Sequence, residues 1–434
     1  MTTTPTLAAG HPLLTLALEP RRHLWIGQHP PFPFESVFLP GCTNFRGPPS
    51  LHRGFDVVWC YEINLNSLAA ESVPLYLDEA IRFLGEEGDL VLRYTQTADF
   101  TIVQLKRHLG RHPNLQAEVT YETQDPDGTF TTVVRIRRLH LENYASNDWT
   151  FAILTQGTKV PNVVKYLKSI RDEDHAARHE ILICGPRNEA YDRFGVNYVD
   201  RTYSTKFADI CAKKNDLAKY ATKPNLLIVH DRYVLDRGFL DGFDEYGSDF
   251  DFVTVTQRYE SGEEFPSYCA LSKTQKSFQW IPPIAITNVN AVYPLTFLNG
   301  GLLAFKTHNL RALPFNDLLF WNQAEDVDLS RWMYDHSLPP RVNLFSSATV
   351  LGLTPAYTSK FRTERKDGRD DEFLTPALPK PVPFAKHHRI SILTRGRRWL
   401  GRHFRKLAAV GLTAMLLLQV ALLYLIATKL GLLR

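Results

Sequence analysis

An apolar run near the middle of the sequence ends abruptly in polar residues that could do chemistry. Residues 226–229 are Leu, Leu, Ile and Val, and they lead directly into His230, Asp231 and Arg232. Parallel α/β sheets bind their ligands beyond the carboxyl ends of the strands, where this cluster would lie. A carboxylate at that position can hold Mg²⁺ or Mn²⁺, and an arginine can contact phosphate directly. The cluster therefore favours a metal or diphosphate site, and a solvated strand end is the alternative.

Two further motifs follow, about 70 and then about 25 residues later. Gly300 and Gly301 precede an apolar run, and Glu325 and Asp326 open a segment with apolar residues at helical spacing. Acidic residues at a helix N-terminus are favoured by the helix dipole, so simple capping is one interpretation of the acidic pair. A catalytic carboxylate is the other.

The region that carries these motifs alternates between short strand-like runs and longer helix-like runs. Such alternation is typical of a parallel α/β sheet. The sequence contains neither G-x-G-x-x-G nor G-x-x-x-x-G-K-[ST], which argues against a standard dinucleotide fold and against a P-loop ATPase. The expected strands lie within residues 148–157, 179–186, 196–200 and 225–233, and the expected helices lie within residues 161–173 and 207–222.

In this order, the strand ending in Asp231, the glycine pair and the Glu-Asp pair resemble a family 2-type glycosyltransferase of GT-A fold. The resemblance covers about residues 148–350. It implies a mixed sheet flanked by helices, with Asp326 as the general base and Glu325 as its neighbour. It also implies a D-x-D metal site for Mg²⁺ or Mn²⁺ at Asp231 and His230. The residues that it assigns to a nucleotide-sugar donor are Thr155, Gln156, Gly157, Lys214, Asn215, Arg232, Gly300 and Gly301.

The chemistry of sugar transfer suits these residue types. A base such as Asp326 would deprotonate the acceptor hydroxyl group as it attacks the anomeric carbon, which inverts that centre in one displacement. Positive charge must stabilise the departing diphosphate, supplied by a metal on Asp231 or by Arg232 and His230 themselves. The D-x-D motif is H-D-R-Y in this chain, with one carboxylate. A GT-A-fold membrane scaffold or binding protein without catalytic activity is therefore the second hypothesis.

The N-terminal domain is expected at residues 1–145. The run FDVVWC predicts a strand, LDEAIRFL a helix, and GDLVLR a second strand after a turn framed by Gly85 and Gly88. A hairpin across residues 126–128 ends the region. Over about 85 residues, this order resembles the second half of a class I methyltransferase. No G-x-G loop precedes Phe55, so we expect a truncated, partial Rossmann-like domain with a structural role. An active methyltransferase is the third hypothesis.

The C-terminal part of the sequence predicts a membrane anchor. Residues 407–428 contain no charged residue, and a helix of that length is about 33 Å long, enough to cross a bilayer core. A basic amphipathic juxtamembrane segment, 389–406, precedes it, after a polar and proline-rich linker at 361–388. The excess of basic residues before the span places the catalytic domain, 146–360, in the cytoplasm. Membrane lipids and a lipid-linked or envelope-polysaccharide acceptor are the expected partners.

The bulk composition supports a folded protein rather than a nucleic-acid-binding one. The formal net charge is +4, the hydrophobic content is 44% and the charged content is 22%. The five cysteines include no C-x-x-C pair, which argues against a zinc finger or disulfide framework and favours a reducing compartment. We interpret Cys60 and Cys184 as small core residues. The N-terminus shows no pattern of a secretory signal.

Overall fold

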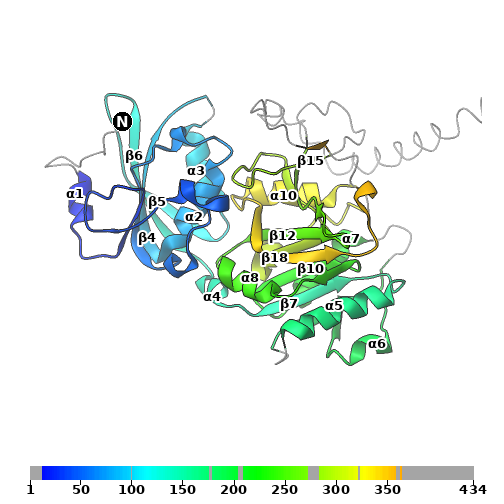
Figure 1. Cartoon of the computed structure of the whole chain (residues 1–434). Coiled ribbons are helices and arrows are strands. Elements are labelled where there is room, and N and C mark those ends of the chain that lie inside the picture. The colour runs from blue at the N-terminus through cyan, green and yellow to red at the C-terminus, as the bar shows by residue number, and fades with distance from the viewer. Residues whose placement is uncertain are drawn as a thin grey trace, which may run out of the picture. The chain divides into compact units, whose positions relative to one another are not determined.

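A computed structural model describes most of the chain before residue 364 (Figure 1). The chain divides into two units, residues 1–376 and 377–434, and the description below concerns the first. The predicted juxtamembrane segment 389–406 and span 407–428 lie outside the described residues, as does most of the linker. In the described part, none of the helices has the length and apolar character that a bilayer crossing requires. The described residues are 12–98, 100–174, 178–203, 209–271, 283–320, 323–357 and 362–363.

The first sheet is built from the N-terminal region in the order β2-β1-β3-β4-β6-β5. The pairs from β2 to β4 are parallel, and the pairs that involve β6 are antiparallel. The predicted hairpin is therefore confirmed as β5 and β6. The strands are β1 (His23–Ile26), β2 (Glu35–Val37), β3 (Phe55–Cys60), β4 (Leu84–Thr95), β5 (Leu115–Gln124) and β6 (Thr129–Arg138).

Helices α1 (Pro12–Ala17), α2 (Val73–Phe83) and α3 (Ile102–Arg111) belong to this region. Thr101 and Gln104 form a capping box that starts α3. The predicted turn at Gly85 and Gly88 is wrong, because β4 begins directly after α2 and runs through both glycines. A side chain at Gly88 would meet the backbone of β3 at 2.8 Å, so this glycine permits close strand packing instead.

The second sheet has the order β11-β18-β12-β17-β10-β7-β8-β9, with β13 paired to β12. Strands β7 to β10 are parallel, as the sequence predicts. Strand β17 is antiparallel to both of its neighbours, β10 and β12, so the expected mixed sheet is confirmed. The strands are β7 (Trp149–Leu154), β8 (Glu180–Cys184), β9 (Asn197–Tyr198), β10 (Asn225–His230), β11 (Tyr233–Leu235), β12 (Phe252–Tyr259), β13 (Glu264–Phe265), β17 (Leu302–Lys306) and β18 (Arg341–Val350).

Helices flank this sheet, and a small third sheet, β16-β14-β15-β19, accompanies it. Pro161 sits in the first turn of α5, where proline is tolerated. The helices are α4 (Leu141–Ala145), α5 (Val160–Glu173), α6 (Glu189–Asp192), α7 (Ile210–Tyr220), α8 (Phe239–Tyr246), α9 (Thr307–Ala312) and α10 (Glu325–Asp335). The third sheet contains β14 (Tyr268–Ala270), β15 (Ile284–Ala285), β16 (Thr296–Leu298) and β19 (Arg362–Thr363). Short 3-10 helices span Leu39–Gly41, Thr43–Phe45, Pro49–Leu51, Leu65–Ser67 and Pro355–Tyr357.

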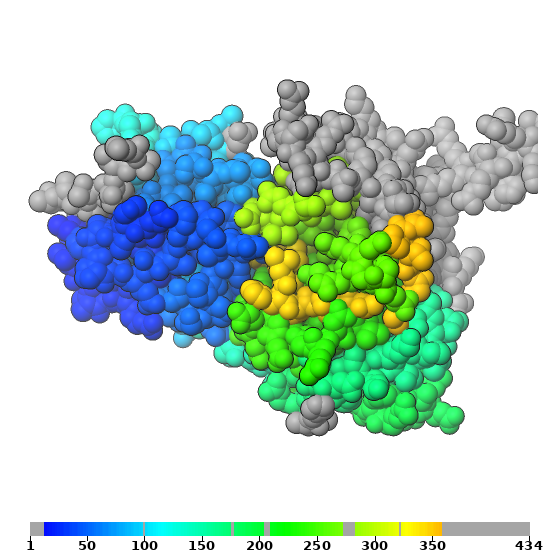
Figure 2. All heavy atoms as spheres, viewed as in Figure 1, coloured from blue at the N-terminus to red at the C-terminus, as the bar shows by residue number. Residues whose placement is uncertain are grey.

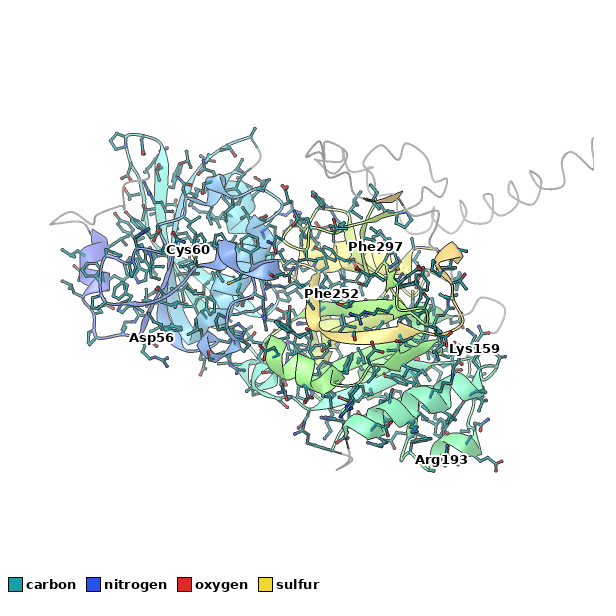
Figure 3. The ribbon with its side chains drawn as sticks, viewed as in Figure 1. Asp56, Cys60, Lys159, Arg193, Phe252 and Phe297 are labelled. Carbon is teal, nitrogen blue, oxygen red and sulfur yellow. The ribbon has the colours of Figure 1, made fainter. Side chains whose placement is uncertain are left out.

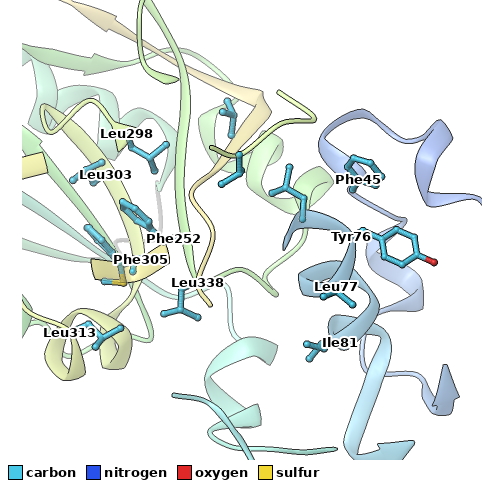
Figure 4. Packing of buried hydrophobic residues seen from close by; sticks show 14 of the residues in the cluster. Phe45, Tyr76, Leu77, Ile81, Phe252, Leu298, Leu303, Phe305, Leu313 and Leu338 are labelled. Atoms are coloured by element: carbon cyan, nitrogen blue, oxygen red, sulfur yellow. The ribbon is translucent and has the colours of Figure 1, made fainter. Parts of the chain in front are cut away.

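The largest apolar cluster is continuous between the two large sheets. It includes Leu77 and Ile81 of α2, and Phe252, Phe305 and Leu338 of the second sheet and its connections (Figure 4). Cys60 and Cys184 are fully buried in the same cluster, which confirms their interpretation as core residues. Because burial of apolar area is the main favourable term in folding, this shared core ties the N-terminal region to the second sheet.

Ionic contacts accompany this apolar cluster. Arg82 of α2 contacts Asp78 at 2.7 Å, Asp249 at 2.8 Å and Asp251 at 2.6 Å. Arg341 of β18 contacts Asp78 at 2.5 Å. We call the set the buried charge network; its four acids and four arginines are Asp78, Glu79, Asp249, Asp251, Arg46, Arg82, Arg138 and Arg341.

Candidate functional site

Asp231 lies directly beyond the carboxyl end of β10, and each of its carboxylate oxygens has a partner. The Thr155 hydroxyl group donates to Oδ2 at 3.0 Å, and the Lys159 ammonium group lies 3.6 Å from Oδ1. Because β7 and β10 are parallel neighbours, their carboxyl ends bring Thr155 and Asp231 to the same edge of the sheet. Figure 3 shows Lys159 beside the start of α5 at this edge.

The residues on either side of Asp231 have buried polar atoms without partners. Nε2 of His230 and Nε of Arg232 accept or donate no hydrogen bond within the described part of the chain. Burial, reinforced by the positive charges of Lys214, Arg232 and Lys159, holds the pKa of His230 well below its usual range. The imidazole is therefore neutral at pH 7. A buried polar atom without a partner costs about 1–3 kcal/mol, a cost that a bound ligand can remove.

Asp326 lies in the first turn of α10 and is held by backbone donors. The Gly300 N–H donates to its Oδ2 at 2.9 Å, and the Val327 N–H donates to its Oδ1 at 3.0 Å. Lys214 of α7 donates to the Gly300 carbonyl oxygen at 2.9 Å and lies 3.4 Å from Glu325. The structure thus brings together the glycine pair, the acidic pair and Lys214.

The two clusters meet where β10 ends and β17 begins. The backbone N–H of His230 donates to the carbonyl oxygen of Gly301 at 2.9 Å. Since β17 is antiparallel to β10, its first residues stand beside the last residues of β10. The Asp326 cluster therefore lies next to the Asp231 cluster because strand β17 runs antiparallel to β10.

Burial, together with the negative charge of Glu325, raises the pKa of Asp326 to about 6. The carboxylate is therefore mostly ionised at pH 7 and a stronger base than an ordinary aspartate. A catalytic base works best when its pKa lies near the working pH. Perturbed carboxylates of this kind gather at functional sites, although structural networks perturb pKa values as well.

The remaining predicted donor residues are placed unequally. Gly157 has a φ of +80° and its N–H donates to the Thr155 hydroxyl oxygen at 3.0 Å, so this turn stands beside Asp231. Gln156 is exposed in the same turn. Asn215 does not face Asp231: its amide donates to the Phe315 carbonyl oxygen at 2.8 Å and to Asp317 at 2.6 Å, fixing the loop before α10.

Lys159 and Asn162 are site residues that the sequence prediction missed. The Asn162 amide donates to the carbonyl oxygen of Asp231 at 3.2 Å. Both residues stand at the start of a helix that follows the first strand of a parallel sheet, and such helix starts face the ligand edge. That position in the sequence, "GTKVPN", is the signal that could have identified them.

The predicted metal position can be tested on its donor atoms. Asp231 supplies one carboxylate, and Lys159 already compensates its charge, so a divalent ion would have to displace the ammonium group. The described side chains that are arranged as metal ligands are instead Asp78, His112 and Asp251. Those carboxylates already accept from Arg82 and Arg341 within the buried charge network. The residues present therefore lack the second carboxylate of a D-x-D site, although Nε2 of His230, beside Asp231, is unpaired within the described part of the chain.

Comparisons with known proteins give only distant similarities. No family model matches the sequence. No curated protein matches it either. Among solved structures, TarS 1-349 of S. aureus is 14% identical, with a TM-score of 0.33, over 47% of this chain and 60% of its own. GalNAc-T7 with UDP, GalNAc and Mn²⁺ is 11% identical, with a TM-score of 0.35, over 48% of this chain and 43% of its own.

A third similar structure is the mannosyltransferase PcManGT from Pyrobaculum calidifontis in complex with GDP-Man and Mn²⁺. It is 15% identical, with a TM-score of 0.34, over 48% of this chain and 58% of its own. This chain thus spans less than two thirds of the length of each of the three. TM-scores at this level assign no family to this chain.

Proposed function

We propose that residues 146–360 form a GT-A-like glycosyltransferase that moves a sugar from a nucleotide-diphosphate sugar to an acceptor hydroxyl group. The observation that carries this proposal is the position of Asp326. A carboxylate with a raised pKa is held by the Gly300 N–H, beside the unpaired polar atoms of His230 and Arg232. A base and a set of anion-binding groups at one sheet edge are the two parts that sugar transfer requires.

The donor diphosphate is held by side chains rather than by a metal. Lys159, Lys214 and Arg232 supply positive charge around the end of β10, and His230 offers a neutral imidazole without a partner. Preorganised donors of this kind stabilise the charge that develops on a leaving group. The turn Thr155–Gly157 receives the nucleotide base.

In the proposed reaction, Asp326 accepts the proton of the acceptor hydroxyl group as its oxygen attacks the anomeric carbon. The bond from that carbon to the diphosphate oxygen breaks in the same step, and the nucleoside diphosphate leaves. One displacement inverts the anomeric centre. A lipid-linked or envelope-polysaccharide acceptor belongs to the proposal because residues 407–428 would hold the enzyme on the cytoplasmic face of a membrane.

Donor binding tests the proposal directly. We expect UDP, GDP or their sugar conjugates to raise the melting temperature of the full-length protein, because a ligand that binds only the native state stabilises it. We expect the shift to persist in EDTA. Absence of a shift with every nucleotide, with or without Mn²⁺, would favour the scaffold hypothesis, which the pairing of Asp231 with Lys159 also motivates.

Replacing Lys159 with methionine should weaken nucleoside-diphosphate binding by about tenfold to a hundredfold, since a charge-assisted contact contributes about 1.5–3 kcal/mol. The measurement is titration calorimetry in EDTA. Lys168→Met, on the same helix α5, is the matched control and should bind normally. If Lys159→Met binds only after Mn²⁺ is added, the lysine replaces a metal; if it binds as tightly as the wild type in EDTA, Lys159 has no part in the site.

Gly300→Ala should lower the transfer rate by at least about tenfold. A Cβ atom at this position would lie 2.9 Å from Cβ of Asp326 and 3.2 Å from Nζ of Lys214, so the base would have to move. A misplacement of about 1 Å can cost a hundredfold in rate. Gly110→Ala is the control, because a Cβ atom there meets no atom within 4 Å. An unchanged rate would show that Asp326 need not be held at this distance.

A further inference from the structure

A cleft of about 230 Å³ lies between helices of the N-terminal region and the C-terminal half of α10. It belongs to no part of the site described above. Its walls come from α2, α3 and α10, from residues just before α2 and α3, from the segment after α10, and from Pro294 before β16. The lining residues are Ala70, Val73, Pro74, Leu77, Phe100, Gln104, Arg107, His108, Pro294, Arg331, Tyr334, Asp335, Ser337 and Pro339.

His108 gives this cleft a buried polar atom that lacks a partner. Nε2 of the imidazole is buried and makes no hydrogen bond to any residue that the structure describes. Burial, reinforced by the neighbouring His112, lowers the pKa of His108 to about 4, so the ring is neutral at pH 7. Buried polar atoms are nearly always hydrogen-bonded, so an unpaired one in a cleft wall points to a ligand or to water.

Charged side chains from α3 and α10 meet at the cleft. Arg331 donates to Asp335 at 2.8 Å through Nε and to the Pro294 carbonyl oxygen at 2.8 Å through Nη1. Arg107 of α3 lies 3.9 Å from the other oxygen of Asp335. The two arginines and the aspartate therefore hold one another in place across the cleft, and their remaining hydrogen-bonding positions are available to a ligand.

The rest of the lining is apolar and partly aromatic, with Leu77, Phe100 and Tyr334 as its largest members. A sugar ring matches this combination, since it has an apolar face of C–H groups and a rim of hydroxyl groups that both donate and accept. A diphosphate matches it less well, because Asp335 places a negative charge in the wall. Binding sites of this type pair apolar walls with a few convergent polar groups.

We propose that this cleft binds a sugar residue of the acceptor glycan, a short distance from the residue that reacts. Helix α10 connects the two places, because Asp326 stands in its first turn and Arg331 and Asp335 in its second half. At about 1.5 Å per residue, they lie about 7.5 and 13.5 Å further along the helix. The acceptor role rests on the proposed glycosyl transfer. Because α2 and α3 line the cleft, this role would give the N-terminal region a direct part in selecting the acceptor.

Saturation-transfer NMR on the full-length protein in detergent tests the cleft with glucose, galactose, mannose and N-acetylglucosamine as separate probes. We expect at least one sugar to bind, and His108→Phe and Arg107→Met each to weaken its binding at least tenfold while UDP binding is unchanged. Arg111→Met, also on α3, is the control and should bind the sugar normally. The melting temperatures of all variants show whether they fold. If His108→Phe does not fold, the variant at the exposed Arg107 still tests the cleft.

Two results would overturn the inference: no sugar in the panel binds, or sugar binding is the same in both cleft variants as in the wild type. The proposed transfer reaction fails separately, through loss of every nucleotide-induced melting shift. Sugar binding that depends on His108 and Arg107 in the absence of any nucleotide effect would retain the cleft as a glycan-binding site and reject only its acceptor role.

Discussion

Asp326→Asn should lower the rate of sugar transfer by about 10²–10⁴-fold and leave the donor affinity within a few fold of the wild type. The loss is that of a general base, whose contribution typically has this size. Asparagine keeps the shape of the side chain and can still accept one of the two backbone hydrogen bonds, from Gly300 or Val327. The measurement is release of nucleoside diphosphate under single-turnover conditions, with binding followed by calorimetry.

Asp328→Asn, an exposed acid on the same helix, is the matched control and should retain the wild-type rate. The pH profile adds a second check. Because the pKa of Asp326 is about 6, the rate should rise about tenfold per pH unit below pH 6 and level off above it. A profile that stays flat from pH 5 to pH 8, or a control as slow as Asp326→Asn, would reject this base.

The raised pKa of Asp326 also makes the stability of the protein depend on pH. The folded state binds the Asp326 proton more tightly than the unfolded chain, whose aspartates have a pKa near 3.9. The resulting stability is fully present below that value and is lost as the pH rises through about 6. At pH 7 the ionised carboxylate therefore costs stability.

Arg82→Met should destabilise the protein by about 3–5 kcal/mol, the cost of leaving buried charges without their partner. Its guanidinium group contacts Asp78, Asp249 and Asp251, all buried. The measurement is urea unfolding of the full-length protein. Arg137→Met, at an exposed position of β6, should change the free energy of unfolding by less than about 0.5 kcal/mol. If both variants changed the free energy of unfolding equally, the buried charge network would contribute no specific stability.

Acid should weaken the same network. Burial alone would raise the pKa of Asp249, but the positive charges of Arg138 and Arg82 lower it to about 2. Burial would likewise raise the pKa of Asp251, but the positive charge of Arg82 holds it below its usual range. Carboxyl groups with depressed pKa values contribute stability that is present above the unfolded value of about 3.9 and is lost as the pH falls through the folded value. Wild-type stability should therefore decrease between about pH 4 and pH 2, and less so in Arg82→Met.

Local patterns in the sequence predicted much of the second sheet. The run of apolar residues 226–229 and the helix started by Pro161 are determined by neighbouring residues, so β10 and α5 were expected correctly. The turn at Gly85 and Gly88 was not, because these glycines serve contact with β3 rather than a change of direction. Glycine permits both, and the sequence alone does not distinguish a turn from close strand packing.

The site was predictable in its acidic and glycine motifs but not in its cations. Asp231, Gly300 and Asp326 follow strands or open a helix, and their order in the chain led to them. Lys159 pairs with Asp231 only because β7 and β10 are neighbours in space. The buried charge network was beyond sequence analysis for the same reason, because Arg82 finds Asp249 167 residues later and Asp251 169 residues later.

These long separations set an order of events during synthesis. When α2 leaves the ribosome, the aspartates at 249 and 251 that receive Arg82 have not been made, and Arg341 follows 263 residues after Asp78. The charged face of α2 must remain hydrated until the later strands arrive, so the first sheet cannot reach its final packing alone. Contacts this distant in the chain slow folding. The packing around α2 is therefore complete only after strand β18 has been made.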